Sequence, residues 1–415
     1  MRKLPLNFRQ VGVGAASRTN SSGLVRWLLI LIATALLSQT ALNLIRPVTT
    51  YKLISFGSGA FTVGVVTAAY AILPLFTAMM LGRASSRIRR IRFLMVAGVA
   101  LLAAGGIGIN FSPNALTVAL ASAVLGLGHL MFTIGGQSSI ARFFPDSDLD
   151  KGFGWFTAAY AAGQFIGPLI GGLVLGSGTD AVSPERIAGI SLSLWIAAGC
   201  SLLAVPFLLP SWQPRISKTA PQTRPAKSEA SIPSVLRIKG MASHMFASMT
   251  LLAMLDILTA FLPLVAEKHG VTPEDVGVLL AIRGFASVVS RLFIPKLSAH
   301  FERNHLLVTS LYISGIAIAL APIFIDSLWA SGAALLVGGF FLGLGQPMTM
   351  TMISTSVPAV DRGAALAVRL MGNRVGQVAL PIISSTVAAG LGPAGAIWFC
   401  CALLCLSGAE KSVRR

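Results

Sequence analysis

Long apolar stretches separated by short polar segments recur along the whole chain. Each stretch is about 20 residues long, which is the length that a helix needs to cross the hydrocarbon core of a bilayer. We count twelve stretches and predict that each is a transmembrane helix. Their predicted first residues lie near Leu24, Phe61, Phe93, Ala115, Gly154, Ile187, His244, Val276, His305, Leu328, Gly363 and Gly395.

The composition indicates a membrane protein and excludes a soluble one. Of the 415 residues, 54% are hydrophobic and only 11% are charged, whereas soluble domains carry about 25% charged residues. The first 23 residues are polar and basic, without a short apolar core and a small-residue cleavage site, so we expect no cleavable signal peptide. We therefore predict an all-α membrane protein.

The positive charge is unevenly placed along the chain, whose formal net charge is +18. With the N-terminus inside, the inner segments hold 25 of the 32 Lys and Arg and the outer segments hold four. This positive-inside bias predicts that both termini are cytoplasmic, in an inner or plasma membrane. We expect the basic surface to meet anionic lipid headgroups, and no nucleic acid.

The two halves of the chain share short sequence matches at a nearly constant offset. The matches pair Val63-Gly64-Val65 with Val276-Gly277-Val278, Gly163-Gln164 with Gly376-Gln377, and 125–129 with 342–346. A polar, proline-rich segment separates the halves. We predict a tail (1–23), a six-helix bundle (24–210), a cytoplasmic linker (211–242), a second six-helix bundle (243–409) and a tail (410–415). In such parallel repeats, the substrate site lies between the bundles near the midplane.

A glycine and proline pattern in the fifth predicted helix resembles the antiporter signature of the major facilitator superfamily. All six positions of the signature are present: Gly154, Gly163, Gly167, Pro168, Gly171 and Gly172. The resemblance covers nearly the whole chain and implies twelve helices in two pseudo-symmetric six-helix bundles around a central cavity. The signature implies proton-driven export, and Gly167 would permit a close helix contact that moves during transport. The alternative is an ordinary packing face.

The loop after the second predicted helix matches the same family in part. Gly82, Arg87 and Arg90 agree with its glycine and basic cluster, but Ser86 stands where the family has an acid. The resemblance implies a gate at this loop. The alternative is that the basic residues only set the orientation in the membrane.

Asp256 is the only acidic residue that we place inside a predicted helix. A charge inside a bilayer is unfavourable, so embedded ionisable residues are functional candidates. We predict that Asp256, midway along the seventh helix, couples transport to protons. The alternative is a static ion pair with an arginine of the eighth or eleventh helix. His129 is a second candidate proton carrier, or else a hydrogen-bonded packing residue.

Arginines and neutral polar residues in the apolar stretches are candidates for binding substrate. An arginine this deep needs a carboxylate, a substrate anion or a water-filled cavity. We place Arg46 near the outer end of the first helix and Arg374 near the midplane. The predicted substrate-binding residues are Arg374, Arg283, Arg369, Asn373, Gln377, Asn43, Gln39, Arg46, Tyr70, Tyr160 and Gln164.

These features predict a secondary active transporter rather than an enzyme, a sensor or a scaffold. We favour export of a small organic compound by proton antiport, with alternating access. The alternative is an organic-anion importer or facilitator, in which arginines bind a carboxylate or phosphate and Asp256 only balances charge. The expected partners are a small-molecule substrate, protons and the lipid bilayer. We expect a monomer that needs no cofactor and no metal.

Overall fold

The computed structural model describes residues 16–88, 90–144, 149–209, 235–238, 240–358 and 361–413. Nearly all of them are helical, and no strand occurs among them. The first half contains α1 (Ala16–Ser55), α2 (Ala60–Arg87), α3 (Ile91–Asn110), α4 (Ala115–Phe143), α5 (Leu149–Leu175), α6 (Pro184–Leu203) and the short α7 (Val205–Leu208). The second half contains α9 (Met241–Lys268), α10 (Pro273–His300), α11 (Arg303–Leu320), α12 (Leu328–Thr355), α13 (Arg362–Leu391) and α14 (Pro393–Val413).

The twelve long helices confirm the predicted all-α membrane fold. Eleven helical segments are long and apolar enough to cross a bilayer. The remaining long helix, α11, has 18 residues and begins with Arg303-Asn304-His305, which leaves it a shorter apolar stretch. It packs against α12 and α14 like a member of the same bundle.

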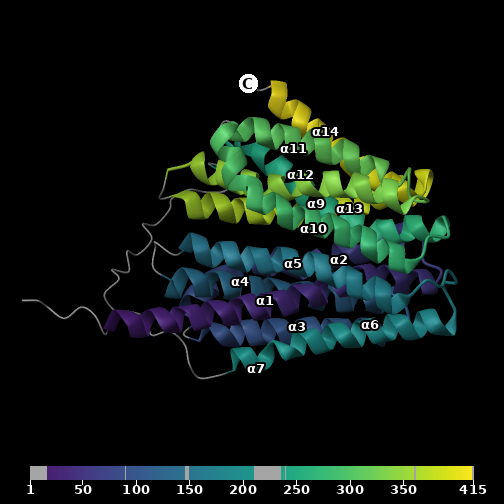
Figure 1. Cartoon of the computed structure of the whole chain (residues 1–415), viewed down its shortest axis with the longest axis horizontal. Helices are drawn as coiled ribbons and strands as arrows, with labels where there is room; N and C mark the ends of the chain where they lie inside the picture. The colour runs from purple at the N-terminus through teal and green to yellow at the C-terminus, as the bar shows by residue number, and fades with distance from the viewer. Residues whose placement is uncertain are drawn as a thin grey trace, which may run out of the picture.

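The helices run side by side and alternate in direction (Figure 1). The helices of the first half occupy the lower part of that view, and those of the second half the upper part. We call the end of the molecule where α1 begins and α14 ends the linker end, and the other end the opposite end. Most of the predicted linker, residues 211–234 and 239, lies outside the described residues. Residues 1–15 of the predicted N-terminal tail also lie outside them.

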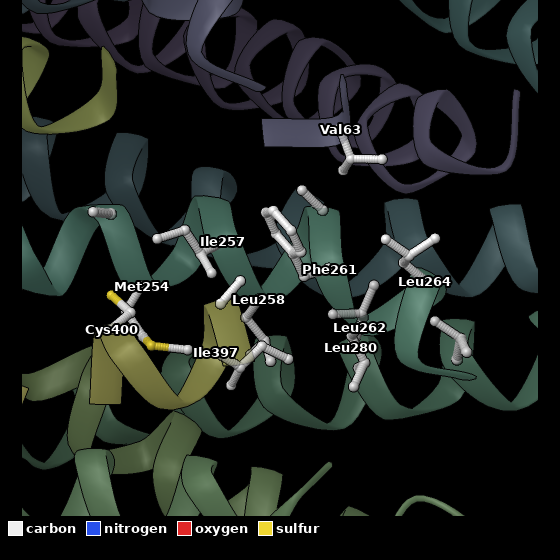
Figure 2. Close-up of a cluster of buried hydrophobic side chains, with 14 of the residues drawn as sticks. Val63, Met254, Ile257, Leu258, Phe261, Leu262, Leu264, Leu280, Ile397 and Cys400 are labelled. Carbon is white, nitrogen blue, oxygen red and sulfur yellow. The ribbon is translucent and has the colours of Figure 1, made fainter. Parts of the chain in front are cut away.

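Helix α9 is the centre of the hydrophobic core. It is apolar on nearly every side, and 83% of its apolar 18-residue stretch is buried inside the protein. This is expected for a helix that other helices surround. Figure 2 shows Ile257 and Phe261 of α9 between Val63 of α2 and the side chains of Ile397 and Cys400 of α14. A polar group midway along α9, such as Asp256, is therefore held far from solvent by the surrounding packing.

Close helix contacts repeat in the two halves at an offset of 213, which two of the three sequence matches share; the third match, of 125–129 with 342–346, is one helical turn out of this register. A methyl group on Gly126 would meet the backbone oxygen of Tyr70, and one on Gly339 would meet the backbone oxygen of Arg283. Both members of the second pair lie 213 positions after those of the first. Tyr70 and Arg283 therefore occupy equivalent places in the two halves.

Two equivalent contacts join the halves toward the opposite end. A methyl group on Gly64 of α2 would lie 2.6 Å from the oxygen of Pro381 on α13, and one on Gly277 of α10 would lie 2.6 Å from the oxygen of Pro168 on α5. The two contacts are again 213 positions apart. The absence of side chains at Gly64 and Gly277 lets the halves approach closely there.

Candidate functional site

The embedded carboxylate forms an ion pair between the two halves. Asp256 Oδ1 of α9 lies 2.6 Å from Arg46 Nη2 of α1, and the two side chains are 5% and 16% exposed. The pair joins α1 to α9 inside the bundle. A buried carboxylate is tolerated when an opposite charge and further hydrogen bonds satisfy it.

The position of Arg46 and the partner of Asp256 both correct the sequence analysis. We placed Arg46 near the outer end of the first helix, but α1 continues for nine more residues to Ser55 and Pro47 lies inside it. Proline is tolerated inside transmembrane helices because neighbouring groups satisfy the freed backbone atoms. We also expected any ion pair of Asp256 to involve the eighth or eleventh helix, whereas its partner belongs to the first.

The amide of Gln377 links the ion pair to a second arginine. Gln377 Nε2 donates to Asp256 Oδ2 at 2.7 Å, and Gln377 Oε1 accepts from Arg374 Nη1 at 2.8 Å. Arg374 and Gln377 are three residues apart on α13 and share a face. Asp256 is thus held by α1 from one half and by α13 from the other, and Arg374 reaches it through the amide.

Aromatic and hydroxyl side chains of the first half cover the Arg46 side of the ion pair. The guanidinium carbon of Arg46 lies 5.1 Å from the ring centroid of Tyr70, within the range of a cation–π contact. The Tyr70 hydroxyl is hydrogen-bonded to Nδ1 of His129, whose ring stacks on that of Tyr70. Thr133 is bonded to the Tyr160 hydroxyl at 2.8 Å and donates to the backbone oxygen of His129.

Thr133 is a member of this cluster that the sequence analysis missed. It follows His129 by four residues on α4, a spacing that places both residues on one face of the helix, so the sequence could have indicated it. A role for His129 in carrying protons remains a prediction, because its bond to Tyr70 also suits a packing residue.

The other predicted binding residues lie around the cluster, with Gln39 and Asn43 buried and Gln164 half-buried. Asn43 donates to the backbone oxygen of Gln39. The backbone of Gln164 packs against Gly284 of α10.

Several polar atoms in this region have no hydrogen-bond partner among the described residues. They include Nε and Nη1 of Arg283, Nε of Arg374 and Oδ1 of Asn373. All three side chains are buried. Buried donors left without a partner are unfavourable, and a bound anion or water would satisfy them.

A cavity of about 610 Å³ lies between α5, α10, α12 and α13 on the linker-end side of the cluster. Arg369 lines it and donates to Gln346 Oε1 at 2.9 Å. Arg291 also lines it and donates to the backbone oxygen of Thr157 at 2.6 Å, which joins the two halves. The structure therefore separates Arg369, at the cavity, from Arg374, in the cluster. Arg291 was not among the predicted site residues, although it follows Arg283 by two turns of the same helix.

The opposite-end side of the cluster is tightly packed. A void of about 30 Å³, lined by Arg46, Thr50 and Tyr70, is large enough for a water molecule but not for an organic solute. Beyond it, Arg186 Nη1 of α6 pairs with Glu267 Oε2 of α9 at 3.2 Å, which again joins the two halves. The cluster lies between an open cavity and a closed end.

The glycine pattern on α5 faces two different neighbours. Methyl groups on Gly163 and Gly167 would meet Gln39 and Thr40 of α1 at 2.4 and 2.7 Å. Gly171 likewise faces Leu44 of α1, whereas Gly172 and Pro168 face Gly277 of α10 in the other half. The Gly167 contact therefore lies inside the first half, and the contact between the halves belongs to Gly172.

The remaining motif residues are open or outside the described side chains. Gly154 has no neighbour that a methyl group would meet and lines the linker-end cavity. Gly82 also has open space around it. Arg90 is exposed beside the ring of Phe93. The Arg87 side chain lies outside the described residues. The roles of these residues in gating remain predictions.

Comparisons with known proteins identify the sequence family and the fold. The sequence profile of the Major Facilitator Superfamily matches residues 28–264 and 244–409. A search of curated protein sequences finds no match.

Three solved transporters share the fold at low sequence identity. An inward-facing, occupied bacterial homologue of the human lysosomal transporter Spinster is 15% identical, with a TM-score of 0.72, covering 93% of this chain and 96% of its own. The nucleoside transporter NupG is 15% identical, with a TM-score of 0.73, covering 93% and 99%. A D-xylose–proton symporter is 14% identical, with a TM-score of 0.74, covering 94% and 97%.

Proposed function

Because this chain belongs to the major facilitator superfamily, we propose that it is a proton-coupled secondary transporter of a small organic anion. Asp256 is the proton-binding group, and Arg46 and Arg374 bind the anion. The observation that carries the proposal is that Asp256 contacts Arg46 directly and Arg374 through Gln377. One carboxylate thus occupies the place between two cations that a substrate carboxylate or phosphate would take.

The surplus of positive charge in the cluster supports an anionic substrate. Arg46, Arg374 and Arg283 surround a single buried acid among the described residues, and Arg283 has two nitrogens without partners. An anion would satisfy such donors in a region of low dielectric constant, where charge interactions are strong. A cationic substrate would find an unfavourable field.

The cavity suggests which side the substrate reaches first. If the positive-inside bias holds, the linker end is cytoplasmic, and the structure corresponds to an inward-facing state. The substrate would then exchange with the cytoplasm through the 610 Å³ cavity. Rocking of the halves about the α1–α9 contact would close this side and open the other.

The ion pair also indicates whether the binding of a proton and the binding of an anion favour or oppose each other. A protonated Asp256 loses its charge attraction for Arg46, so Arg46 becomes available to an anion. An anion on Arg46 in turn favours the protonated form of Asp256 by linkage. Proton and anion therefore bind together, which is the sign of cotransport.

A second candidate function is export of an organic compound by proton antiport. The complete glycine and proline signature on α5 favours it. In that case a neutral or cationic substrate would bind Asp256 itself and displace its proton, so that proton and substrate compete.

Purified protein can distinguish the two functions. Thermal stabilisation by benzoate, succinate and glycerol phosphate would be compared with that by tetraphenylphosphonium, at acidic and at alkaline pH. We expect an anion to stabilise the protein more at acidic pH, and a proton gradient to drive its uptake into proteoliposomes. Stabilisation only by the cation, and more at alkaline pH, would favour antiport. Absence of gradient-driven flux for every binding compound would overturn proton-coupled transport.

A further inference from the structure

The linker-end cavity has a different chemical character from the polar cluster above it. Nine of its fifteen lining residues are apolar, among them Trp155, Val288, Leu292 and Met350. Three are basic, and none of the described residues that line it is acidic. A site that accepted only a hydrophilic anion would gain nothing from these apolar walls, because burying apolar surface is what stabilises such a contact.

Two of the basic residues that line this apolar space come from different helices, Arg291 from α10 and Arg369 from α13. Each guanidinium already holds an oxygen acceptor, Thr157 O for Arg291 and Gln346 Oε1 for Arg369. These hydrogen bonds fix the positions of the two guanidinium groups. A guanidinium has five N–H donors, so donors remain for a ligand.

The cavity lies on the linker-end side of the central arginines. Arg374 lies five residues beyond Arg369 on α13, about 7.5 Å deeper at 1.5 Å per residue. Ala161, which lines the cavity, follows Tyr160 of the cluster. An acidic headgroup could pass from Arg369 to Arg374 while its apolar part stays against α5 and α10.

We propose that this cavity binds an amphipathic anion, with its carboxylate or phosphate between Arg291 and Arg369 and its hydrocarbon or aromatic part against Trp155, Leu292 and Met350. The inference rests on the proposed transport of an anion and adds the substrate class. The cavity volume lies within the range of about 300–1,000 Å³ found for sites that enclose drug-sized ligands. Trp155 and Leu292 remain largely exposed, so the apolar part can extend past the rim. The ligand is a soluble amphipathic substrate or an anionic lipid of the bilayer, which share this chemistry.

Quenching of Trp155 by a brominated ligand tests the proposal without any transport step. The protein would be placed in nanodiscs of neutral lipid and titrated with ω-bromoundecanoate. We expect saturable quenching that undecanoate reverses, that a tenfold excess of succinate does not, and that Trp155→Phe abolishes. The matched cation, ω-bromoundecyltrimethylammonium, should quench only in a linear, unsaturable manner through the lipid.

Arginine variants locate the headgroup. Arg291→Gln and Arg369→Gln should each raise the dissociation constant obtained from the saturable quenching by about tenfold, because a charged hydrogen bond to the ligand is lost. Lys296→Gln, an exposed basic residue of the same helix α10, should leave it unchanged. Thermal melting would confirm that the variants fold. If a variant does not fold, the comparison of the anionic and cationic ligands on the unmodified protein still tests the proposal.

Further measurements distinguish a lipid ligand from a soluble one, and the proposed binding site from the proposed transport function. If phosphatidylglycerol in the discs competes with the bromo acid, the anionic lipid occupies the site; if it does not, a soluble amphiphile does. Either result supports an amphipathic-anion site. Equal binding of the cation, or displacement by succinate, would overturn it even if a hydrophilic anion is transported. Saturable binding without gradient-driven flux would support this binding site and overturn the proposed proton-coupled transport.

Discussion

Arg46 of α1 and Asp256 of α9 pair with each other at the interface between the two halves of the chain, at 2.6 Å. One turn further along the same helices, Thr50 Oγ1 donates to the backbone oxygen of Ala260 at 3.0 Å. Helices α1 and α9 therefore stay in contact across the interface for at least one turn, and they carry opposite charges there.

Each of the two helices also packs on a glycine of its own half. Arg46 lies seven residues after Gln39, which packs against Gly163 of α5. Asp256 lies seven residues after Met249, which packs against Gly376 of α13. The two opposite charges thus lie on closely packed helices, where neither can be removed without leaving the other buried alone.

Exchanging the two charges should preserve the pair. Arg46→Ala or Asp256→Ala alone leaves a buried charge without its partner, which we expect to destabilise the protein by about 3–5 kcal/mol. The double variant Arg46→Asp with Asp256→Arg should recover most of that loss, since the two side chains face each other across the interface and the Gln377 amide can donate or accept. Thermal melting of the purified variants measures this. A double variant no more stable than the single ones would show that the surroundings of the two positions do not accept the exchanged charges.

Asp256→Asn should remove proton coupling while keeping the hydrogen bond to Gln377. An asparagine fills the same volume and still offers an oxygen acceptor, but it does not titrate. We expect substrate exchange without a gradient to persist, and accumulation driven by a proton gradient to fall to the background. Asp326→Asn is the matched control, because Asp326 is exposed and pairs with His269 at the surface. Gradient-driven accumulation in the Asp256→Asn protein would rule out Asp256 as the coupling group.

The apolar pattern was sufficient to predict the membrane helices, and the short matches were sufficient to predict the repeat. These features depend on sequence alone, because helix length follows from bilayer thickness and because repeated glycines mark repeated close contacts. Asp256 and Arg374 could be selected in the same way, since charges inside apolar stretches are rare.

The partner of Asp256 could not be predicted, because it depends on how α1 is rotated toward α9. We took Arg46-Pro47 as the end of a helix, and the depth assigned to Arg46 was wrong as a result. The apolar cavity beside Arg291 and Arg369 could not be predicted from the sequence either. It arises from the spacing of four helices that belong to different halves, and no local pattern records that spacing.

Glu267→Gln should weaken the closure of the opposite end. Glu267 is a partner of the buried Arg186, whose guanidinium also lies over the ring of Tyr51 and donates to the backbone oxygen of Gly178. Loss of the charge leaves Arg186 less well satisfied when the halves are closed. We expect a shift toward the state that is open at this end, by roughly tenfold for a loss of about 1.4 kcal/mol.

Cysteine labelling would detect that shift. Thr49 lines the small closed void next to Arg46, so a Thr49→Cys protein without native cysteines should react slowly with a membrane-impermeant maleimide added from the opposite end. Glu267→Gln should speed this reaction, whereas Glu274→Gln, at the same end of α10 but not paired with Arg186, should not. An unchanged labelling rate in the Glu267→Gln protein would exclude the ion pair as a gate.

Two glycines of the α5 signature should give different defects when replaced by alanine. A methyl group on Gly167 would lie 2.7 Å from Thr40 O and 2.8 Å from Asn43 C, both in the backbone of α1 within the same half. A methyl group on Gly172 would lie 2.8 Å from Gly277 Cα in the other half. Backbone atoms cannot give way as a flexible side chain can, and such overpacking destabilises a contact by about 1–3 kcal/mol.

The location of each contact determines which property changes. Gly167→Ala strains a contact that is present in every transport state, so we expect a lower melting temperature and little change in Thr49→Cys labelling from the opposite end. Gly172→Ala strains a contact that forms only when that end is closed, so labelling should accelerate while the melting temperature falls less. Gly199→Ala on α6, where a methyl group would meet no neighbour, should alter neither property. If Gly167→Ala accelerates labelling as much as Gly172→Ala does, the α1–α5 contact itself moves during transport, and the two halves do not rock as rigid bodies.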